Sequence, residues 1–310
     1  MKRTSKLLVA LLVILAMTAT MMMGCQNQAA DQTTEAPQEN VPAVTYPLTV
    51  ADDAVAGGKF TGTYADATKN GEGKITYDNG DVYEGPIVAG IAIGNGKITY
   101  KDGDVYEGLV INGLPEGAFG KLTKGGDVYV GGFSGGKIKG EGSFTWKDGH
   151  VFTGVFEGVG EGTGDLTADG FLAYTTGLSF DGTLVKGEPT KGTFYWPGNS
   201  PKWTGNFTAF LTGYGDLDMG NGIFYRGPMF AGVLTNCDEW LATGEKVVIQ
   251  YPVREDGKYV GEKFEGEYIV DQETLKDVLI GTMTYPDGTV IENVTIALNF
   301  SFAYTVPEGK

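Results

Sequence analysis

Residues 83–105 read YEGPIVAGIAIGNGKITYKDGDV, and this 23-residue phrase returns along much of the chain. Its opening, Tyr83-Glu84-Gly85, recurs as Tyr106-Glu107-Gly108, Tyr129-Val130-Gly131 and Phe152-Thr153-Gly154, each 23 residues after the last. Repetition at a fixed period is typical of an array in which one supersecondary unit stacks on the next. The sequence therefore predicts a repeat protein.

A tighter phrase inside this period marks the best-preserved copies: Gly-x-x-x-aromatic-x-x-Gly-x-x-aromatic. Between its two aromatic positions lie Asn, Asp and Gly, as in Asp78-Asn79-Gly80. These residues form tight turns because they reach positive φ at little cost, so each copy is predicted to be a β-hairpin. The copies are Gly73/Tyr77/Gly80/Tyr83, Gly96/Tyr100/Gly103/Tyr106, Gly142/Trp146/Gly149/Phe152, Gly215/Met219/Gly222/Tyr225 and Gly281/Tyr285/Gly288/Ile291.

The alternation of side chains along the strands predicts the length of the hairpin loop. A two-residue Asn79-Gly80 turn would pair Tyr77 with Val82 and place Tyr83 on the opposite face from Tyr77. A three-residue loop with Gly80 in the left-handed conformation gathers rings, aliphatic side chains and glycines on one face and opposite charges on the other, and we predict this loop. Its cross-strand pairs are Ile75–Tyr83, Gly73–Gly85, Lys74–Glu84 and, one repeat later, Lys97–Glu107.

Glycine accounts for 50 of the 310 residues, about twice its usual share of a soluble chain. Because an interior glycine costs a helix roughly 1 kcal/mol, we predict little or no helix. Aromatic residues make up 12% of the chain, and their rings can cover bare glycines in a thin sheet. The predicted fold is all-β: an elongated, open antiparallel sheet of tandem hairpins.

Tandem Tyr-x-Gly phrases separated by glycine-rich segments resemble the MORN repeat family. The resemblance implies an open antiparallel sheet of hairpins, and it implies no single activity, because MORN arrays accompany many. We interpret the positions that define the repeat as structural. They are Gly73, Tyr77, Gly80, Tyr83, Gly85, Gly96, Tyr100, Gly103, Tyr106, Gly108, Tyr129, Gly131, Gly142, Trp146, Gly149, Phe152, Gly154, Trp203, Gly205, Tyr225 and Gly227.

Residues 1–24 are predicted to be a signal peptide, because three basic residues precede an apolar segment, which is followed by a cleavage region that contains small residues. Met22-Met23-Gly24-Cys25 resembles a bacterial lipobox, with Met22 where Leu is usual. The resemblance implies cleavage before Cys25, a diacylglycerol on its thiol, and a lipid-anchored protein on the extracytoplasmic face of a bacterial membrane. The alternative is an uncleaved anchor helix over 7–23, at the short limit for spanning a bilayer.

The rest of the chain divides by composition and by how well it keeps the repeat. Residues 25–45 are polar and predicted to be a disordered tether. A first repeat array is predicted over 46–170, a second sub-array over 171–232, and an irregular β part with a final degenerate repeat and a cap over 233–310. Phe171 to Ser179 fits no copy of the phrase and is interpreted as the joint between the sub-arrays.

Local departures from the repeat carry predictions of their own. Phe119 stands where the repeat calls for glycine, which predicts a β-bulge offset by a shorter turn at Gly125-Gly126. Segments 247–253 and 259–262 are predicted to be longer strands, and the polar insert 271–277 is predicted to form one helical turn.

The inventory of chemically reactive residues is poor, so no catalytic, cofactor or metal site is predicted and we expect no enzyme. The one histidine, His150, falls at a hairpin shoulder and is interpreted as a turn residue. Cys237 is interpreted as a small apolar residue, since no histidine lies near it in sequence. Asp216 and Asp218 resemble the start of a calcium loop, but Gly227 stands where that loop needs glutamate, and calcium binding there stays open.

The net charge of −16 becomes −19 once the three basic residues of the signal peptide are removed, which excludes nucleic acid as a partner. We predict a non-catalytic interaction or scaffold protein whose partner is another protein or a cell-wall polymer, held at the membrane only through its N-terminal lipid. The alternative is a carbohydrate-active surface protein that stacks sugars on Trp146, Trp196 and Trp203. Tryptophans packed inside the sheet would indicate structure, and tryptophans aligned in an open groove would indicate sugar binding.

Overall fold

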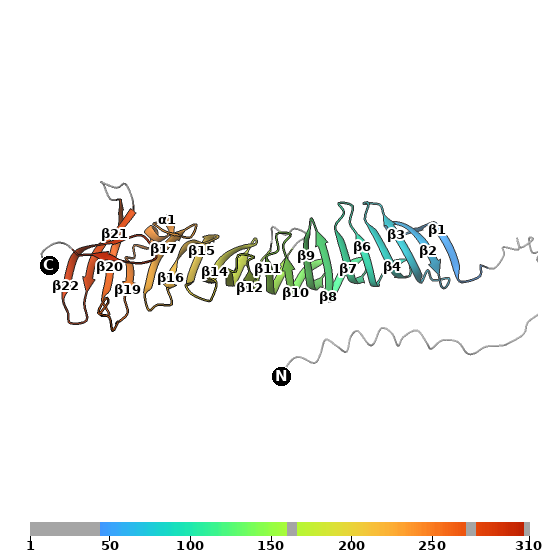
Figure 1. Cartoon of the computed structure of the whole chain (residues 1–310). Helices are drawn as coiled ribbons and strands as arrows, with labels where there is room; N and C mark the ends of the chain where they lie inside the picture. Colours follow the sequence, from blue (N-terminus) through green and yellow to red (C-terminus); the bar gives the residue numbers. More distant parts are fainter. Residues whose placement is uncertain (1–43, 160–165, 271–276, 307–310) are drawn as a thin grey trace, which may run out of the picture. The chain divides into compact units, whose positions relative to one another are not determined.

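The computed structural model describes residues 44–159, 166–270 and 277–306, and these form one antiparallel sheet of 23 strands with a single short helix. Each long strand pairs with the one that follows it in the chain (Figure 1). The two-residue strands β5 and β18 lie beside β4 and β17, which also pair with β6 and β19. The all-β fold predicted from glycine content and turn chemistry is confirmed.

In the first half of the chain the strands are β1 (Leu48–Val55), β2 (Gly58–Tyr64), β3 (Gly71–Tyr77), β4 (Val82–Val88), β5 (Ile91–Ala92), β6 (Gly94–Thr99), β7 (Val105–Ile111), β8 (Leu114–Lys124), β9 (Asp127–Ser134), β10 (Lys137–Thr145) and β11 (Val151–Val159). In the second half they are β12 (Ala168–Ala173), β13 (Ser179–Val185), β14 (Glu188–Tyr195), β15 (Lys202–Ala209), β16 (Thr212–Asp218), β17 (Phe224–Phe230), β18 (Val233–Leu234), β19 (Val247–Gln250), β20 (Lys263–Val270), β21 (Asp277–Thr284), β22 (Val290–Ala297) and β23 (Tyr304–Thr305).

The hairpin loop has the predicted length of three residues. The Tyr77 N–H donates to the Asp81 carbonyl at 2.9 Å, the Gly80 N–H donates to the Tyr77 carbonyl at 3.0 Å, and Gly80 has φ +95°. This loop fixes the register, because the side-chain period of a strand is two. All four predicted pairs occur: Ile75–Tyr83, Gly73–Gly85, Lys74–Glu84 and Lys97–Glu107.

The irregular third repeat is also confirmed. The register of β8 shifts against both of its neighbours around Phe119, whose side chain is 83% exposed. At the end of β8 a two-residue Gly125-Gly126 turn joins Lys124 to Asp127. The extra residue leaves the ladder at the bulge, and the shorter turn restores the phase of the next hairpin.

The interpretation of Phe171 to Ser179 as a segment outside the repeat is wrong. Strand β12 pairs with β11 and β13 in regular register, with Gly170 facing Gly154 on one side and Gly182 on the other. The Tyr174 N–H donates to the Leu178 carbonyl at 2.9 Å, as in the other three-residue loops. The pairing therefore continues across 170/171, where the boundary between sub-arrays was predicted.

The C-terminal part departs most from the predictions. The predicted strand over 247–253 is only β19, and 259–262 contains one isolated bridge, Val253–Val260. A helix, α1 (Asp238–Thr243), precedes β19. The predicted terminal cap consists of β22 and β23 around Phe302, which is fully buried. Residues 160–165 and nearly all of the insert 271–277 lie outside the described residues.

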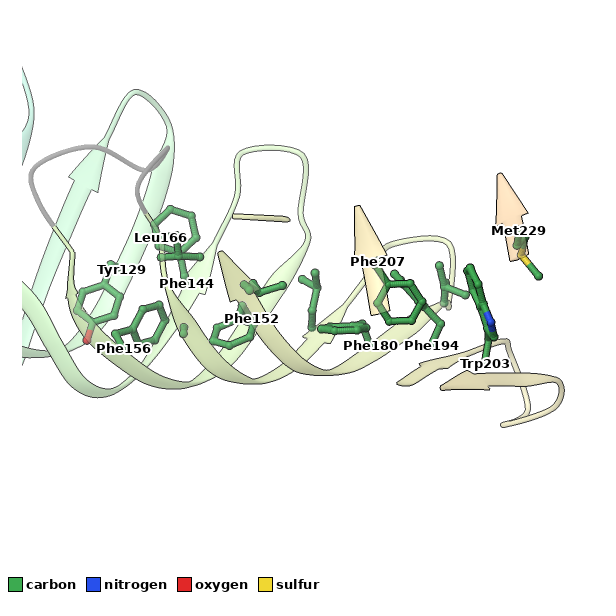
Figure 2. Close-up of a cluster of buried hydrophobic side chains, with 14 of the residues drawn as sticks. Tyr129, Phe144, Phe152, Phe156, Leu166, Phe180, Phe194, Trp203, Phe207 and Met229 are labelled. Atoms are coloured by element: carbon green, nitrogen blue, oxygen red, sulfur yellow. The ribbon is translucent and has the colours of Figure 1, made fainter. Parts of the chain in front are cut away.

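One face of the sheet carries the core, and there rings such as Tyr83 and Tyr106 cover glycines. A Cβ atom added to Gly96 would lie 2.5 Å from Cε2 of Tyr83, and one added to Gly120 would lie 2.7 Å from Cε2 of Tyr106. Figure 2 shows buried rings, among them Phe152, following one another along the array. The predicted cover of glycines by aromatic rings is therefore confirmed.

Candidate functional site

The outer face of the first array is a polar row in which charges of opposite sign face each other from strand to strand. Glu84 lies between Lys74 and Lys97, and Glu107 lies between Lys97 and Lys121. The Lys121 and Glu107 charges are 3.9 Å apart, with both side chains about half exposed. Such pairs contribute little to stability, but their alternation leaves no concentrated charge on this part of the surface.

The hairpin turns at one end of the strands form a long side of the sheet, which we call the first edge. Successive turns along it are hydrogen-bonded to one another. Asp81 Oδ1 accepts the Lys101 N–H of the next turn at 2.9 Å. His150 occupies the equivalent shoulder, and its Nδ1 accepts the Thr175 N–H at 3.3 Å. The turns of the first edge are those at 78–80, 101–103, 125–126, 147–149 and 175–177.

The opposite edge, called the second edge, has its own chain of bonds. The Gly113 N–H donates to the Ala92 carbonyl at 3.1 Å, and the Gly136 N–H donates to the Pro115 carbonyl at 3.0 Å. The turns of the second edge are those at 89–90, 112–113, 135–136, 186–187, 210–211 and 231–232. Bonds along both edges hold successive hairpins in a fixed orientation.

The face of the sheet that carries the core is called the inner face here. A groove of about 590 Å³ lies on it between the two edges of the first array. Tyr77 and Tyr100 line it from the first edge, and Ile91 and Leu114 line it from the second. Ile91 and Leu114 are 41% and 49% exposed, so the groove offers apolar surface to solvent. A concave surface with exposed aliphatic and aromatic groups is the usual form of a binding site.

A second hollow, of about 370 Å³, lies further along the inner face. Its lining includes the rings of Trp146, Tyr174 and Phe210 and the carboxylates of Asp148 and Glu188. Burial raises the pKa of Tyr174 above its usual range, and the negative charge of Glu188 adds to the effect. We call this site the ring hollow.

His150 belongs to the ring hollow as well as to the turn. Its Nδ1 accepts a backbone N–H, so Nε2 carries the hydrogen of the neutral ring and faces Asp148 Oδ2 at 3.6 Å. The imidazole packs edge-on against Tyr174, with centroids 5.0 Å apart. A backbone N–H thus bonds to one ring nitrogen of His150, and its role as a turn residue stays a prediction.

The tryptophans named as candidate sugar platforms do not form one aligned surface. Trp203 is fully buried among core rings, and its Nε1 has no hydrogen-bond partner in the part of the chain that the structure describes. Trp146 and Trp196 are half-buried against the core, and of these two Trp146 lines the ring hollow. The arrangement is structural at Trp203, and Trp146 faces a cavity.

The remaining candidates do not come together. Asp216 lies 3.7 Å from Arg226 and Asp218 lies 3.4 Å from Lys202, so each carboxylate faces a basic side chain. Among the described residues no group of three or more possible metal ligands occurs. Cys237 is half-buried at the start of α1 and packs against the core.

Several structural positions were missed by sequence reasoning. Gly170, Tyr174, Gly177 and Phe180 repeat the spacing of the phrase, so the signal that could have found them was present in the sequence. Phe180 is fully buried like the rings of the recognised copies. Glu188 and Phe210 have no place in the phrase, and only the folded turns bring them to the ring hollow.

Comparison with known proteins supports the resemblance that the repeats suggested. A family model described as MORN repeat matches residues 60–82, 83–105, 129–151 and 280–290. The first three matches begin at Phe60, Tyr83 and Tyr129, each a buried ring over glycine. No curated protein matches the chain. The chain thus contains MORN repeats.

The membrane attachment predicted from the sequence falls outside the described residues, which begin at 44. Within the described ranges, no helix has the length and apolar character needed to cross a membrane. The signal peptide and the lipid on Cys25 stay predictions from residues 1–25.

Proposed function

We propose that this protein is a membrane-tethered, extracytoplasmic interaction or scaffold protein without catalytic activity, which presents its inner groove to another protein. The observation that carries the proposal is the 590 Å³ groove of the first array, whose walls include exposed Ile91 and Leu114. Location outside the cytoplasm follows from the lipobox-like sequence at Cys25. A repeat array bonded along both edges suits a scaffold, because its binding surface is fixed before the partner arrives.

The sheet offers a matched pair of variants to test the groove. Ile91 and Leu114 line it, whereas their cross-strand neighbours Val88 and Ile111 are similarly exposed and do not. Charged groups in an apolar groove oppose docking through desolvation. Chemical cross-linking in intact envelopes is expected to give a discrete adduct that Ile91→Asp with Leu114→Asp abolishes and Val88→Asp with Ile111→Asp preserves. If both double variants are folded and lose the cross-linked adduct equally, the groove is not the docking surface.

A cell-wall polysaccharide is the second candidate partner, and Trp146 in the ring hollow is the observation that favours it. Sugar binding uses aromatic faces together with polar groups, and Asp148 lies beside Trp146 in the lining. Sedimentation of the protein with purified cell-wall polymer, lost in Trp146→Ala, would favour this candidate over a protein partner.

A further inference from the structure

The ring hollow joins the two edges of the sheet through perpendicular aromatic contacts. Tyr174 lies on the first edge, and Phe210, on the second, packs edge-on against it with centroids 5.2 Å apart and planes at 65°. His150 meets the same ring at 72°. The rings of Tyr174, Phe210 and His150 thus meet at a corner and not in one plane. Its volume of about 370 Å³ is enough for a small ligand.

Apart from His150, whose Nε2 lies 3.6 Å from Asp148 Oδ2, the charged side chains that line the ring hollow are acidic. Asp148 and Glu188 supply two carboxylates, and no lysine or arginine contributes to its lining. No ion pair involving Glu188 occurs within 44–159, 166–270 and 277–306. Aromatic walls beside the Glu188 carboxylate attract cations and repel phosphates and carboxylates.

One of the two carboxylates comes from a turn position that carries a basic residue in the first array. Glu188 directly follows the turn at 186–187, and Lys137 directly follows the turn at 135–136, which is its counterpart in the first array. Lys137 lines the 590 Å³ groove and Glu188 lines the ring hollow. The same turn position therefore places opposite charges at the two sites, and the two sites are expected to select different ligands.

We propose that the ring hollow binds a small organic cation, a protonated or quaternary amine, among the rings of Trp146, Tyr174 and Phe210 and close to the Glu188 carboxylate. Aromatic faces hold such cations through their quadrupoles, and a carboxylate adds a direct attraction. A compact ammonium group fits a corner of perpendicular rings, because several ring faces can surround it. This site is independent of the partner that the first groove takes.

The proposal is tested by isothermal titration of the full-length protein, in a non-ionic detergent, with choline chloride. Saturable binding in the millimolar range or tighter is expected, and 3,3-dimethylbutan-1-ol, an uncharged molecule of nearly the same shape, is expected to bind at least about tenfold more weakly. No saturable heat with choline, or equal affinity for the uncharged analogue, would overturn the proposal.

Two variants at exposed positions assign the binding to this site. Glu188→Gln removes the charge at an exposed position and is expected to weaken choline binding several-fold, and Phe210→Ala removes an exposed ring with a similar effect. Glu84→Gln makes the same charge change on the outer face and is expected to leave binding unaltered. Equal weakening by both glutamine variants would overturn the assignment, as would saturable binding of N-acetylglucosamine in place of choline.

Discussion

At Gly96 an added methyl group would lie 2.5 Å from Cε2 and 2.8 Å from Cζ of the Tyr83 ring, in ordinary backbone conformation. Gly96→Ala is therefore expected to push the ring off the sheet and lower the free energy of unfolding by roughly 1–3 kcal/mol, as overpacking does. Asn95→Ala, an exposed change one residue away, is the control and should cost far less. Urea unfolding measures both, and equal midpoints would show that the ring does not depend on the bare glycine.

Three buried tyrosines link stability to alkaline pH. Burial raises the pKa of Tyr83, Tyr106 and Tyr129 to about 12, whereas a phenol in the unfolded chain titrates near about 10. The unfolded state thus loses protons first, so the stabilisation is fully present below pH 10 and is lost as pH rises towards 12. Urea unfolding at several pH values across this window should show a falling free energy, with a shallower fall in Tyr106→Phe. A pH-independent free energy would contradict the burial of these hydroxyl groups.

The sequence predicted residue-level features wherever the determining forces are local. Gly80 at positive φ and the alternation around Tyr83 were enough to set the register, because both act within one hairpin. The ring hollow was not predicted, because Tyr174 and Phe210 meet only when the two edges of the folded sheet approach each other. Nothing in the repeated phrase encodes that contact.

At the scale of the hairpin, the bonds between successive turns explain why an aspartate directly follows the turn in several repeats. Asp81 accepts the Lys101 N–H from the next turn at 2.9 Å, and Asp127 accepts the Lys147 N–H in the same way. Asp81→Ala is expected to cost about 1 kcal/mol of stability, because a backbone donor loses its partner. Asp81→Asn keeps an acceptor oxygen and should recover part of that loss. Thermal unfolding of both variants measures the difference, and equal losses would show that the acceptor oxygen contributes nothing.

The hairpin loop and its cross-strand pairs were predicted correctly in the first array, whereas the segments after β18 differ from the predictions. In the array each strand repeats a phrase whose turns specify where it ends. Beyond β18, Tyr251 donates to the Phe302 carbonyl at 2.8 Å, and Tyr304 donates to the buried Glu262 at 2.7 Å. These contacts join segments far apart in the chain, so single-sequence periodicity could not predict them.

For the whole molecule, the distribution of charge argues against membrane binding through the repeats. Each basic residue held near an anionic bilayer contributes about 1 kcal/mol of binding free energy, so binding needs a cluster of several such residues. On the outer face Lys74, Lys97 and Lys121 are separated by Glu84 and Glu107, so their fields largely cancel. The expected net charge of −19 for the mature chain opposes approach as well.

The proposed attachment through a lipid on Cys25 is tested most directly by the Cys25→Ser variant, expressed in a bacterial host and fractionated into membrane and soluble material. The wild-type protein is expected in the membrane fraction at all salt concentrations. The variant is expected to leave that fraction, because the thiol that would carry the diacylglycerol is gone. A Cys25→Ser protein that stays with the membrane in high salt would contradict the lipid anchor and favour a helix over 7–23, and one released only by salt would assign attachment to the repeats.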